Sequence, residues 1–219
     1  MVSGIAPDAN IVAVRVFGHA LGAYDSDILA GLSWVQTNAA ALNITAVNLS
    51  LGGTPTPDDV CLTANAAYET AFANLIAVGV APAVAAGNDS NQTLITPPAC
   101  VPSAISVGST NANDSVSAFS NVSASLDLMA PGNLVGGAVP INKWAVMSGT
   151  SMATPVVAAA FALAHKADPT RNVASWLASF KATGTPVSAN VISNIPRISI
   201  SNALSQYAGL QAPSTVNAM

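Results

Sequence analysis

The chain has 219 residues, of which 51% are hydrophobic and only 7% charged, with 6 Lys and Arg against 10 Asp and Glu. Its mean hydropathy of +0.50 does not indicate a membrane-spanning helix, because the longest apolar run, residues 75–86, is broken by Gly79 and Pro82 and falls short of the ~20 residues that cross a bilayer. A net charge of −4 without a Lys/Arg cluster argues against nucleic-acid binding, and the length fits one domain.

Short apolar runs rich in β-branched residues alternate along the chain with segments of helical periodicity. These runs predict strands at residues 11–17, 46–50, 83–86, 104–107 and 126–129. Most of them are apolar without alternation, as strands covered on both faces are. The helical spacing predicts one helix capped by residues 25–27 and further helices at residues 60–74, 154–166 and 170–183. This order predicts an α/β fold, a parallel sheet with crossover helices on both faces.

The ends and the two cysteines leave alternatives open. The first residues carry neither a basic segment nor an apolar stretch, so no signal peptide is predicted. Either the protein is cytoplasmic or the chain lacks the start of a longer one. Cys61 and Cys100 are either a pair or two buried thiols, and their number alone favours neither. Residues 206–219 are expected to form a polar C-terminal tail.

The strongest chemical motif is the segment from Ser148 to Pro155, which opens a predicted Ala/Val-rich helix. Ligands of parallel sheets bind beyond the carboxyl ends of the strands, so such segments are where chemistry is expected. Ser151 is expected at the N-terminus of this helix. There, its backbone N–H and the positive end of the helix dipole can stabilise the oxyanion that forms when its hydroxyl attacks a carbonyl group. For an isolated Gly-Thr-Ser, the favoured interpretation is that Ser151 is only a helix N-cap.

Two further strand ends add to this motif. Asn88 follows the strand at residues 83–86, and its side-chain amide is a second candidate oxyanion donor, although a Gly-Asn pair alone is typical of a turn. The strand at residues 46–50 is followed by Leu51, Gly52 and Gly53, and the two glycines leave the backbone without side chains. This segment either pairs with an extended peptide or forms a simple turn at the end of the strand. A phosphate loop is not indicated, because the chain contains no Gly-x-Gly-x-x-Gly and no Gly-Lys-Ser/Thr.

In this order, the motifs resemble the subtilisin-like serine peptidases, the subtilases. The resemblance covers residues 2–205. The segments that carry it include Gly-Ile-Ala-Pro-Asp-Ala at residues 4–9, Asn-Leu-Ser-Leu-Gly-Gly at 48–53, Ala-Ala-Gly-Asn at 85–88, Met-Ala-Pro-Gly at 129–132 and Gly-Thr-Ser-Met-Ala-Thr-Pro at 149–155. The related sedolisins share a similar serine motif but place Asp in the oxyanion hole, so Asn88 and Met152 favour the subtilases.

The resemblance implies a role for each matching residue. Ser151 would be the nucleophile that forms the acyl intermediate, and Asn88 the oxyanion-hole side chain. Leu51, Gly52 and Gly53 would pair with the substrate backbone. Ala85, Ala86 and Gly87 would form one wall of the pocket for the residue before the scissile bond. The partner implied is an extended polypeptide, with no nucleic acid and no membrane, and the complete protein would be a monomer. No cofactor is expected. Calcium is common in the family, but no metal site is identified in this sequence.

The chain departs from the family in its acid and base. Subtilases carry an Asp in Asp-Ser/Thr-Gly and a His in His-Gly-Thr-His before the serine, and neither motif occurs here. Of the two histidines, His165 lies far along the helix that follows Ser151, and His19 corresponds to a substrate-groove loop. Asp27 and Asp127 match structural motifs of the family. The N-terminal strands and the histidine helix are therefore expected to be missing and the triad incomplete.

Three expectations follow from the resemblance. Cys61 and Cys100 match a disulfide of some bacterial subtilases, which implies an extracellular compartment. The missing Asp strand would lie between the strands at residues 11–17 and 46–50, so the chain is expected to be poorly stable alone. The leading hypothesis is a secreted serine endopeptidase represented without its N-terminal part, so that this chain is inactive alone. The alternative is a short, non-catalytic module that binds peptides along residues 51–53.

Overall fold

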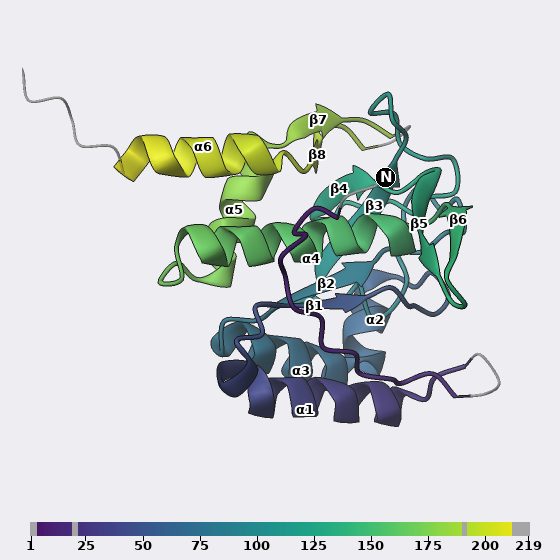
Figure 1. Cartoon of the computed structure of the whole chain (residues 1–219). Helices are drawn as coiled ribbons and strands as arrows, with labels where there is room; N and C mark the ends of the chain where they lie inside the picture. Colours follow the sequence, from purple (N-terminus) through teal and green to yellow (C-terminus); the bar gives the residue numbers. More distant parts are fainter. Residues whose placement is uncertain (1–3, 19–21, 190–191, 212–219) are drawn as a thin grey trace, which may run out of the picture.

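The structure is a computed structural model that describes residues 4–18, 22–189 and 192–211. Its strands are β1 (Ala46–Leu49), β2 (Ala81–Ala85), β3 (Ile105–Thr110), β4 (Leu128–Pro131), β5 (Val135–Val139), β6 (Lys143–Met147), β7 (Thr185–Val187) and β8 (Ile195–Arg197). Its helices are α1 (Asp25–Leu42), α2 (Asp58–Ala64), α3 (Ala66–Ala77), α4 (Thr150–Ala167), α5 (Val173–Thr183) and α6 (Ile200–Gln211). Figure 1 shows their arrangement.

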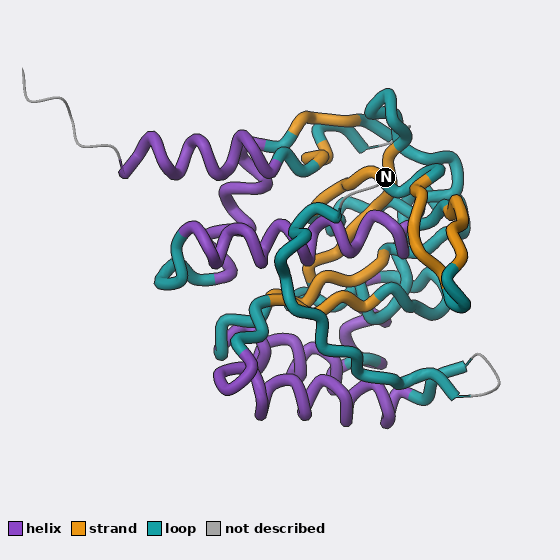
Figure 2. Tube along the Cα trace, in the orientation of Figure 1, coloured by secondary structure: helices purple, strands orange, loops and turns teal. Residues whose placement is uncertain are grey.

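One six-stranded sheet organises the fold, with the strand order β1-β2-β3-β4-β8-β7. Strands β1 to β4 and β8 run parallel, and β7 pairs antiparallel with β8. Strands β5 and β6 form a separate antiparallel hairpin. Figure 2 shows the sheet between α4 on one side and the pair α1 and α3 on the other. The predicted α/β fold with helices on both faces is therefore confirmed.

The central strands are buried on both faces, as their continuous apolar sequence predicts. All five residues of β2 are buried. Ala81 and Ala83 belong to the core cluster under α4, whereas Val84 belongs to the cluster that contains buried residues of α1 and α3. Because successive side chains of a strand point to opposite faces, a strand between two helical layers needs apolar residues at every position.

The strand predicted at residues 11–17 is wrong. These residues form a coil, coloured purple in Figure 1. Val14 and Val16 lie against α1, where a Cβ added to Gly31 would be 3.2 Å from a methyl carbon of each. Ile11 is 87% exposed and Phe17 is 42% exposed. A strand needs a partner for its N–H and C=O groups, and across the described residues none pairs with this segment.

Helix boundaries also differ from the prediction. The helix expected at residues 60–74 is two helices, α2 and α3, which meet at Asn65. The Asn65 side chain donates to the Cys61 carbonyl at 2.9 Å, and such local bonds compete with helical hydrogen bonding. Helix α5 begins after Asn172, whose side chain accepts from the Ser175 amide. The hairpin β5–β6, the pair β7–β8 and helix α6 were not predicted. Their sequences show neither the 3.6-residue spacing of a helix nor the alternation of a strand clearly.

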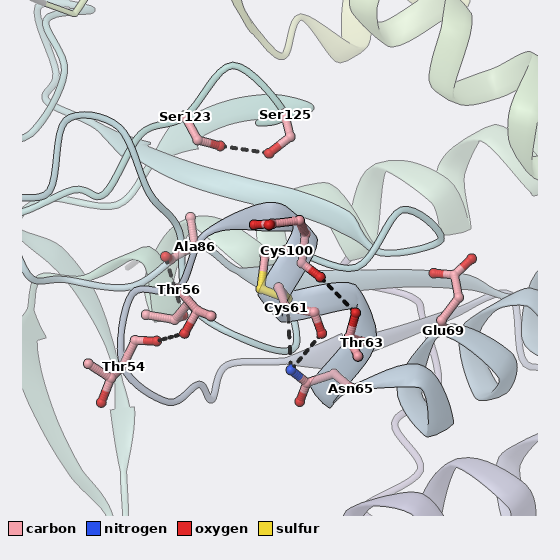
Figure 3. The surroundings of a disulfide bond; sticks show 12 residues. Thr54, Thr56, Cys61, Thr63, Asn65, Glu69, Ala86, Cys100, Ser123 and Ser125 are labelled. Carbon is pink, nitrogen blue, oxygen red and sulfur yellow. Dashed lines mark hydrogen bonds between the residues drawn. A yellow bond between two sulfur atoms is a disulfide. The ribbon is translucent and has the colours of Figure 1, made fainter.

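A disulfide joins Cys61 in α2 to Cys100 in the turn before β3, with Cα atoms 6.1 Å apart. Figure 3 shows the bond, with Asn65 beside it. Both cysteines are buried. The pairing implied by the family resemblance is therefore present. It ties the helix after β1 to the chain that enters β3.

Helix α6 continues beyond the expected start of the tail at residue 206, up to Gln211, and residues 212–219 lie outside the described part. Tyr207 anchors it: the phenol donates to Asp168 at 2.5 Å, and the ring lies 5.0 Å from that of Trp176. Hydrogen bonds from Thr170 and then Tyr207 lower the pKa of Asp168 to about 2. No helix among these described residues is long and apolar enough to cross a membrane.

Strand β1 is an edge of the described sheet, since it pairs only with β2. Its other row of N–H and C=O groups is a template for intermolecular pairing. We expect concentration-dependent self-association, measured by sedimentation velocity, together with a broad thermal transition. Asn48 is exposed in β1, and Asn48→Lys should shift the distribution towards monomer because a charge on an edge strand opposes pairing.

The matched control is Thr63→Lys, which adds the same charge at an exposed position of α2. It should leave the association unchanged. A wild-type chain that sediments as a monomer and unfolds in one sharp transition would contradict the expectation.

Candidate active site

The carboxyl ends of β1 and β2 meet the N-terminus of α4 at one edge of the sheet. Helix α4 contacts β1 and β2, so the segments that follow these strands lie beside its first turn. Together they form a pocket of about 240 Å³. Its lining residues are Leu51, Gly52, Gly53, Ala85, Gly87, Asn88, Asp89, Thr96, Thr150 and Ser151.

Ser151 lies in the first turn of α4, which starts at Thr150. The segment that follows β1 is fixed to this turn, because the Ser50 hydroxyl donates to the Ser151 carbonyl at 2.8 Å. Pro155 is the sixth residue of the helix and has no N–H to donate to the Ser151 carbonyl four residues earlier, so the Ser50 hydroxyl supplies the hydrogen bond that this carbonyl would otherwise lack. The Ser151 side chain is therefore presented at the positive end of an 18-residue helix.

The Asn88 side chain is oriented by Thr150. Its Oδ1 accepts from the Thr150 amide at 2.8 Å and from the Thr150 hydroxyl at 3.1 Å. With Oδ1 occupied, the Nδ2 group is the end left for a ligand. A Cβ built on Gly149 would lie 3.5 Å from Asn88 Nδ2 and 3.6 Å from the Ser151 backbone nitrogen. Gly149 thus leaves free of a side chain a position that is close to two donor nitrogens and 3.7 Å from Asn88 Oδ1.

Gly87 allows the turn that brings Asn88 to α4. Its φ of +103° is a conformation that L-residues with a side chain rarely adopt. A Cβ there would also collide with Nδ2 of Asn121 and lie 2.5 Å from Cγ2 of Thr96. Ala86, which the sequence placed in the pocket wall, does not line the pocket. It is fully buried, and its carbonyl accepts from the Thr96 amide and from Asn121 Nδ2.

The segment of Leu51, Gly52 and Gly53 forms the opposite side of the pocket. The Gly53 amide donates to the Pro97 carbonyl at 2.8 Å, which fixes the end of the segment. Gly52 and Gly53 are exposed and Leu51 is half-buried. The pairing of this segment with an extended peptide stays a prediction, in which the Gly53 amide is already bound to Pro97.

None of the titratable groups that were named from the sequence and that the structure describes lines this pocket. His165 is 14 residues after Ser151 on α4, which is roughly 21 Å along a helix axis. His19 lies outside the described residues. Asp27 is in the first turn of α1, and Asp127 binds Ser106 and Lys181. Among the residues that the structure describes, no group of three His, Cys, Asp or Glu side chains could hold a metal ion.

Seven of the eight predicted catalytic and substrate-binding residues therefore line one pocket, all except Ala86. Three lining residues, Asp89, Thr96 and Thr150, were not predicted from the sequence. Asp89 and Thr150 adjoin predicted site residues, so adjacency was a usable signal. Thr96 carries no such signal, because it reaches the pocket through a loop that folds back on residues 86 and 87.

Comparison with known proteins gives one consistent result. A sequence model of the protein family described as "Subtilase family" matches residues 1–196 of this chain. "Extracellular serine proteinase" of Thermus sp. (strain Rt41A) is 36% identical over 198 residues, 90% of this chain and 45% of that protein. "Subtilisin-like protease 1" of Arthroderma gypseum is 39% identical over 158 residues, 71% of this chain and 31% of that protein. The chain thus spans less than half the length of these curated relatives.

A solved structure, "Crystal structure of a cold adapted subtilisin-like serine proteinase", superposes with a TM-score of 0.77 at 32% identity. The match covers 89% of this chain and 68% of that one. At this identity and TM-score the similarity concerns both the sequence and the fold.

Proposed function

The chain belongs to the subtilase family, and we propose that it is part of a serine endopeptidase that hydrolyses peptide bonds through Ser151. The observation that carries the proposal is the pair of donors beside Gly149, namely Asn88 Nδ2 and the Ser151 backbone N–H. Both nitrogens lie within 3.6 Å of the position that a Cβ on Gly149, two residues before Ser151, would occupy.

In the proposed mechanism, the Ser151 oxygen attacks the substrate carbonyl carbon. The carbonyl oxygen gains negative charge as the tetrahedral intermediate forms. Asn88 Nδ2 and the Ser151 N–H stabilise this charge. The C–N bond then breaks, the amine leaves with the proton that the base took from Ser151, and water hydrolyses the resulting acyl intermediate to release the acid and restore the hydroxyl. Because Thr150 already holds Asn88 Oδ1 at 2.8 Å, the amide needs no reorientation during the reaction. Removing one such donor costs about 10²–10³ in kcat in related sites.

The exposed backbone of residues 51–53 is proposed to pair with the substrate as an added strand. This places the residue before the scissile bond in the pocket between that segment and the wall formed by Ala85 and Gly87. The substrate class that fits is an extended polypeptide. The disulfide favours an extracellular protein, since disulfides persist in oxidising compartments.

Ser151 needs a base to accept its proton, and we propose that these 219 residues do not supply it. His165 is too distant, and the family's His-Gly-Thr-His and Asp-Ser/Thr-Gly motifs do not occur in the sequence. The base and its acid would come from polypeptide outside this sequence, so the chain alone would be inactive. The second candidate function is a peptide-binding module without catalysis. It is favoured by the absence of the family's His and Asp motifs from the sequence.

The test is expression of the chain together with any sequence that its reading frame encodes upstream of Met1. We expect hydrolysis of a fluorogenic peptide that Ser151→Ala abolishes. Asn88→Ala should lower kcat about 10²–10³-fold with little change in KM, because the amide acts on the transition state. Asn113→Ala changes an exposed amide in the β3–β4 connection and serves as the control, with no effect expected.

Activity that survives Ser151→Ala would overturn the proposed mechanism. A stop codon directly upstream of Met1, combined with no turnover by the chain, would favour the peptide-binding module.

A further inference from the structure

We propose that Asn43 and Asn113 are sites of N-glycosylation, a covalent modification that is independent of the chemistry proposed for Ser151. Asparagine in the triplet Asn-x-Ser/Thr, with x other than proline, accepts N-linked glycans in proteins that pass through a secretory compartment. The disulfide between Cys61 and Cys100 favours this route, since secretory compartments are where disulfides form. The sequence contains six such triplets, which begin at Asn43, Asn48, Asn88, Asn91, Asn113 and Asn121.

The glycan is attached to the side-chain nitrogen of the asparagine. Its donor is an oligosaccharide linked to a polyprenyl diphosphate, and an oligosaccharyltransferase catalyses the transfer. A bond forms between Nδ2 and the anomeric carbon of the sugar, the bond from that carbon to the diphosphate oxygen breaks, and Nδ2 loses one of its two protons. The lipid diphosphate leaves, and nothing is oxidised or reduced. The folded chain therefore accommodates a glycan only where Nδ2 reaches solvent and is not needed for hydrogen bonds of the fold.

Two of the six asparagines use Nδ2 within the fold. Asn121 is 0% exposed, and its Nδ2 donates to the Ala86 carbonyl at 3.1 Å and to Asp89 Oδ2 at 2.9 Å. The amide of Asn48 is folded back on the Ser50 hydroxyl, to which its Nδ2 donates at 3.0 Å. A glycan on either nitrogen would displace these bonds, and at Asn121 it would also have to enter the protein interior.

Two further asparagines lie where a glycan has no room. Asn91 is half-buried, and its Oδ1 accepts from the amides of Thr93 and Leu94, which keeps the side chain against its own loop. Nδ2 of Asn88 is 3.5 Å from the Cβ position of Gly149, beside the pocket. A sugar there would fill the space that the proposed function assigns to the substrate.

Asn113 meets the requirement, because a rigid turn in the β3–β4 connection presents it to solvent. The Asn111 amide donates to the Ser115 carbonyl at 2.8 Å, and Asp114 forms an ion pair of 2.7 Å with Arg197. Asn113 Oδ1 accepts from the Ser115 hydroxyl at 2.7 Å and from the Ser115 amide at 3.2 Å. Asn113 is exposed, and no residue in the described ranges binds its Nδ2. The nitrogen that bonds the sugar is thus the free end of an oriented amide.

Asn43 meets it at the end of α1. The residue caps this helix with a left-handed φ of +50°, and its backbone amide donates to the Ala40 carbonyl. Its side chain is exposed and makes no hydrogen bond with the part of the chain that the structure describes. The hydrogen bonds of the helix end are therefore made by the backbone, and Nδ2 of Asn43 is available for modification.

The test is production of the full chain, behind a secretory signal peptide, in a eukaryotic cell. A peptide N-glycosidase removes N-linked glycans and converts each modified Asn into Asp, which peptide mass spectrometry detects. Analysing all of the chain from cells and medium makes the result independent of how much is secreted. We expect the conversion at Asn43 and Asn113. In the soluble fraction the other four asparagines should be unmodified, and Asn43→Gln and Asn113→Gln should each remove one glycan.

Ser115→Ala should abolish the glycan on Asn113, because it removes the hydroxyl of the triplet, whereas Ser115→Thr should keep it. The matched control is Asn142→Gln, which changes an exposed asparagine outside any triplet and should leave both glycans in place. An unmodified Asn43 or Asn113 in the total chain would overturn the inference. A soluble chain with a glycan on Asn88 would contradict the proposed oxyanion role of that residue and leave this inference standing, so the two proposals fail separately.

Discussion

A fluorophosphonate probe is expected to label Ser151 of the isolated chain very slowly. The probe reacts with a serine hydroxyl that an adjacent base has activated. In the described residues, the Ser151 hydroxyl has no hydrogen-bonded base, and His165 lies roughly 21 Å along α4. Loss of the base from such a triad lowers turnover by about 10⁶, a magnitude measured on subtilisin itself, and we expect labelling to be slowed comparably.

Intact mass spectrometry after timed incubation measures the labelled fraction, and Ser151→Ala gives the background. Rapid stoichiometric labelling of Ser151 would mean that another group of this chain acts as the base. In that case His19→Gln would show whether His19 is that group. Comparison with the chain extended by its upstream reading frame shows whether labelling is restored, and near-UV circular dichroism of the two chains shows whether the extension also changes the fold.

Loss of the disulfide is expected to cost about 4 kcal/mol of unfolding free energy. The bond closes a loop with a sequence separation of 39, and the chain-entropy model gives about this value for such a loop. The change to make is the double substitution Cys61→Ala and Cys100→Ala, measured by urea unfolding. Since domains are stable by only about 5–15 kcal/mol, this loss is a large part of the total.

A reductant separates the covalent link from the packing of the two buried sulfur atoms. Adding dithiothreitol should lower the stability of the wild-type chain and leave the double variant unchanged. Thiol titration of the denatured, unreduced protein should find no free sulfhydryl, in line with the absence of free cysteines in the structure. Two free thiols after aerobic purification would contradict the pairing and remove the main structural support for an extracellular protein.

The fold class and most of the central elements were predictable, because the hydrophobic residues of each element follow one clear pattern. Strands β1 to β4 are short apolar runs, and α1 and α4 show clear helical spacing. The prediction failed where a partner decides the structure. Residues 11–17 have the composition of a strand but form a coil, because no described strand pairs with them. The prediction also missed β7 and β8, which are three residues each and each contain a proline.

Within the site, the sequence by itself determined the identity of the reactive groups. Ser151 at the start of an apolar helix and Asn88 after a buried strand are local patterns, since each depends on its immediate neighbours along the chain. The glycines beside them are local in the same way, because each meets a backbone requirement of its own turn.

Only the tertiary structure decided how these groups are arranged. The bond from Thr150 to Asn88 spans 62 positions, and the bond from Asn121 to Asp89 spans 32. No local pattern encodes contacts over such separations, because they arise when packing of α4 and the β3–β4 connection against the sheet brings distant loops together. The orientation of the Asn88 amide, the position of Thr96 at the pocket and the fixed carboxylate of Asp89 are all consequences of that packing.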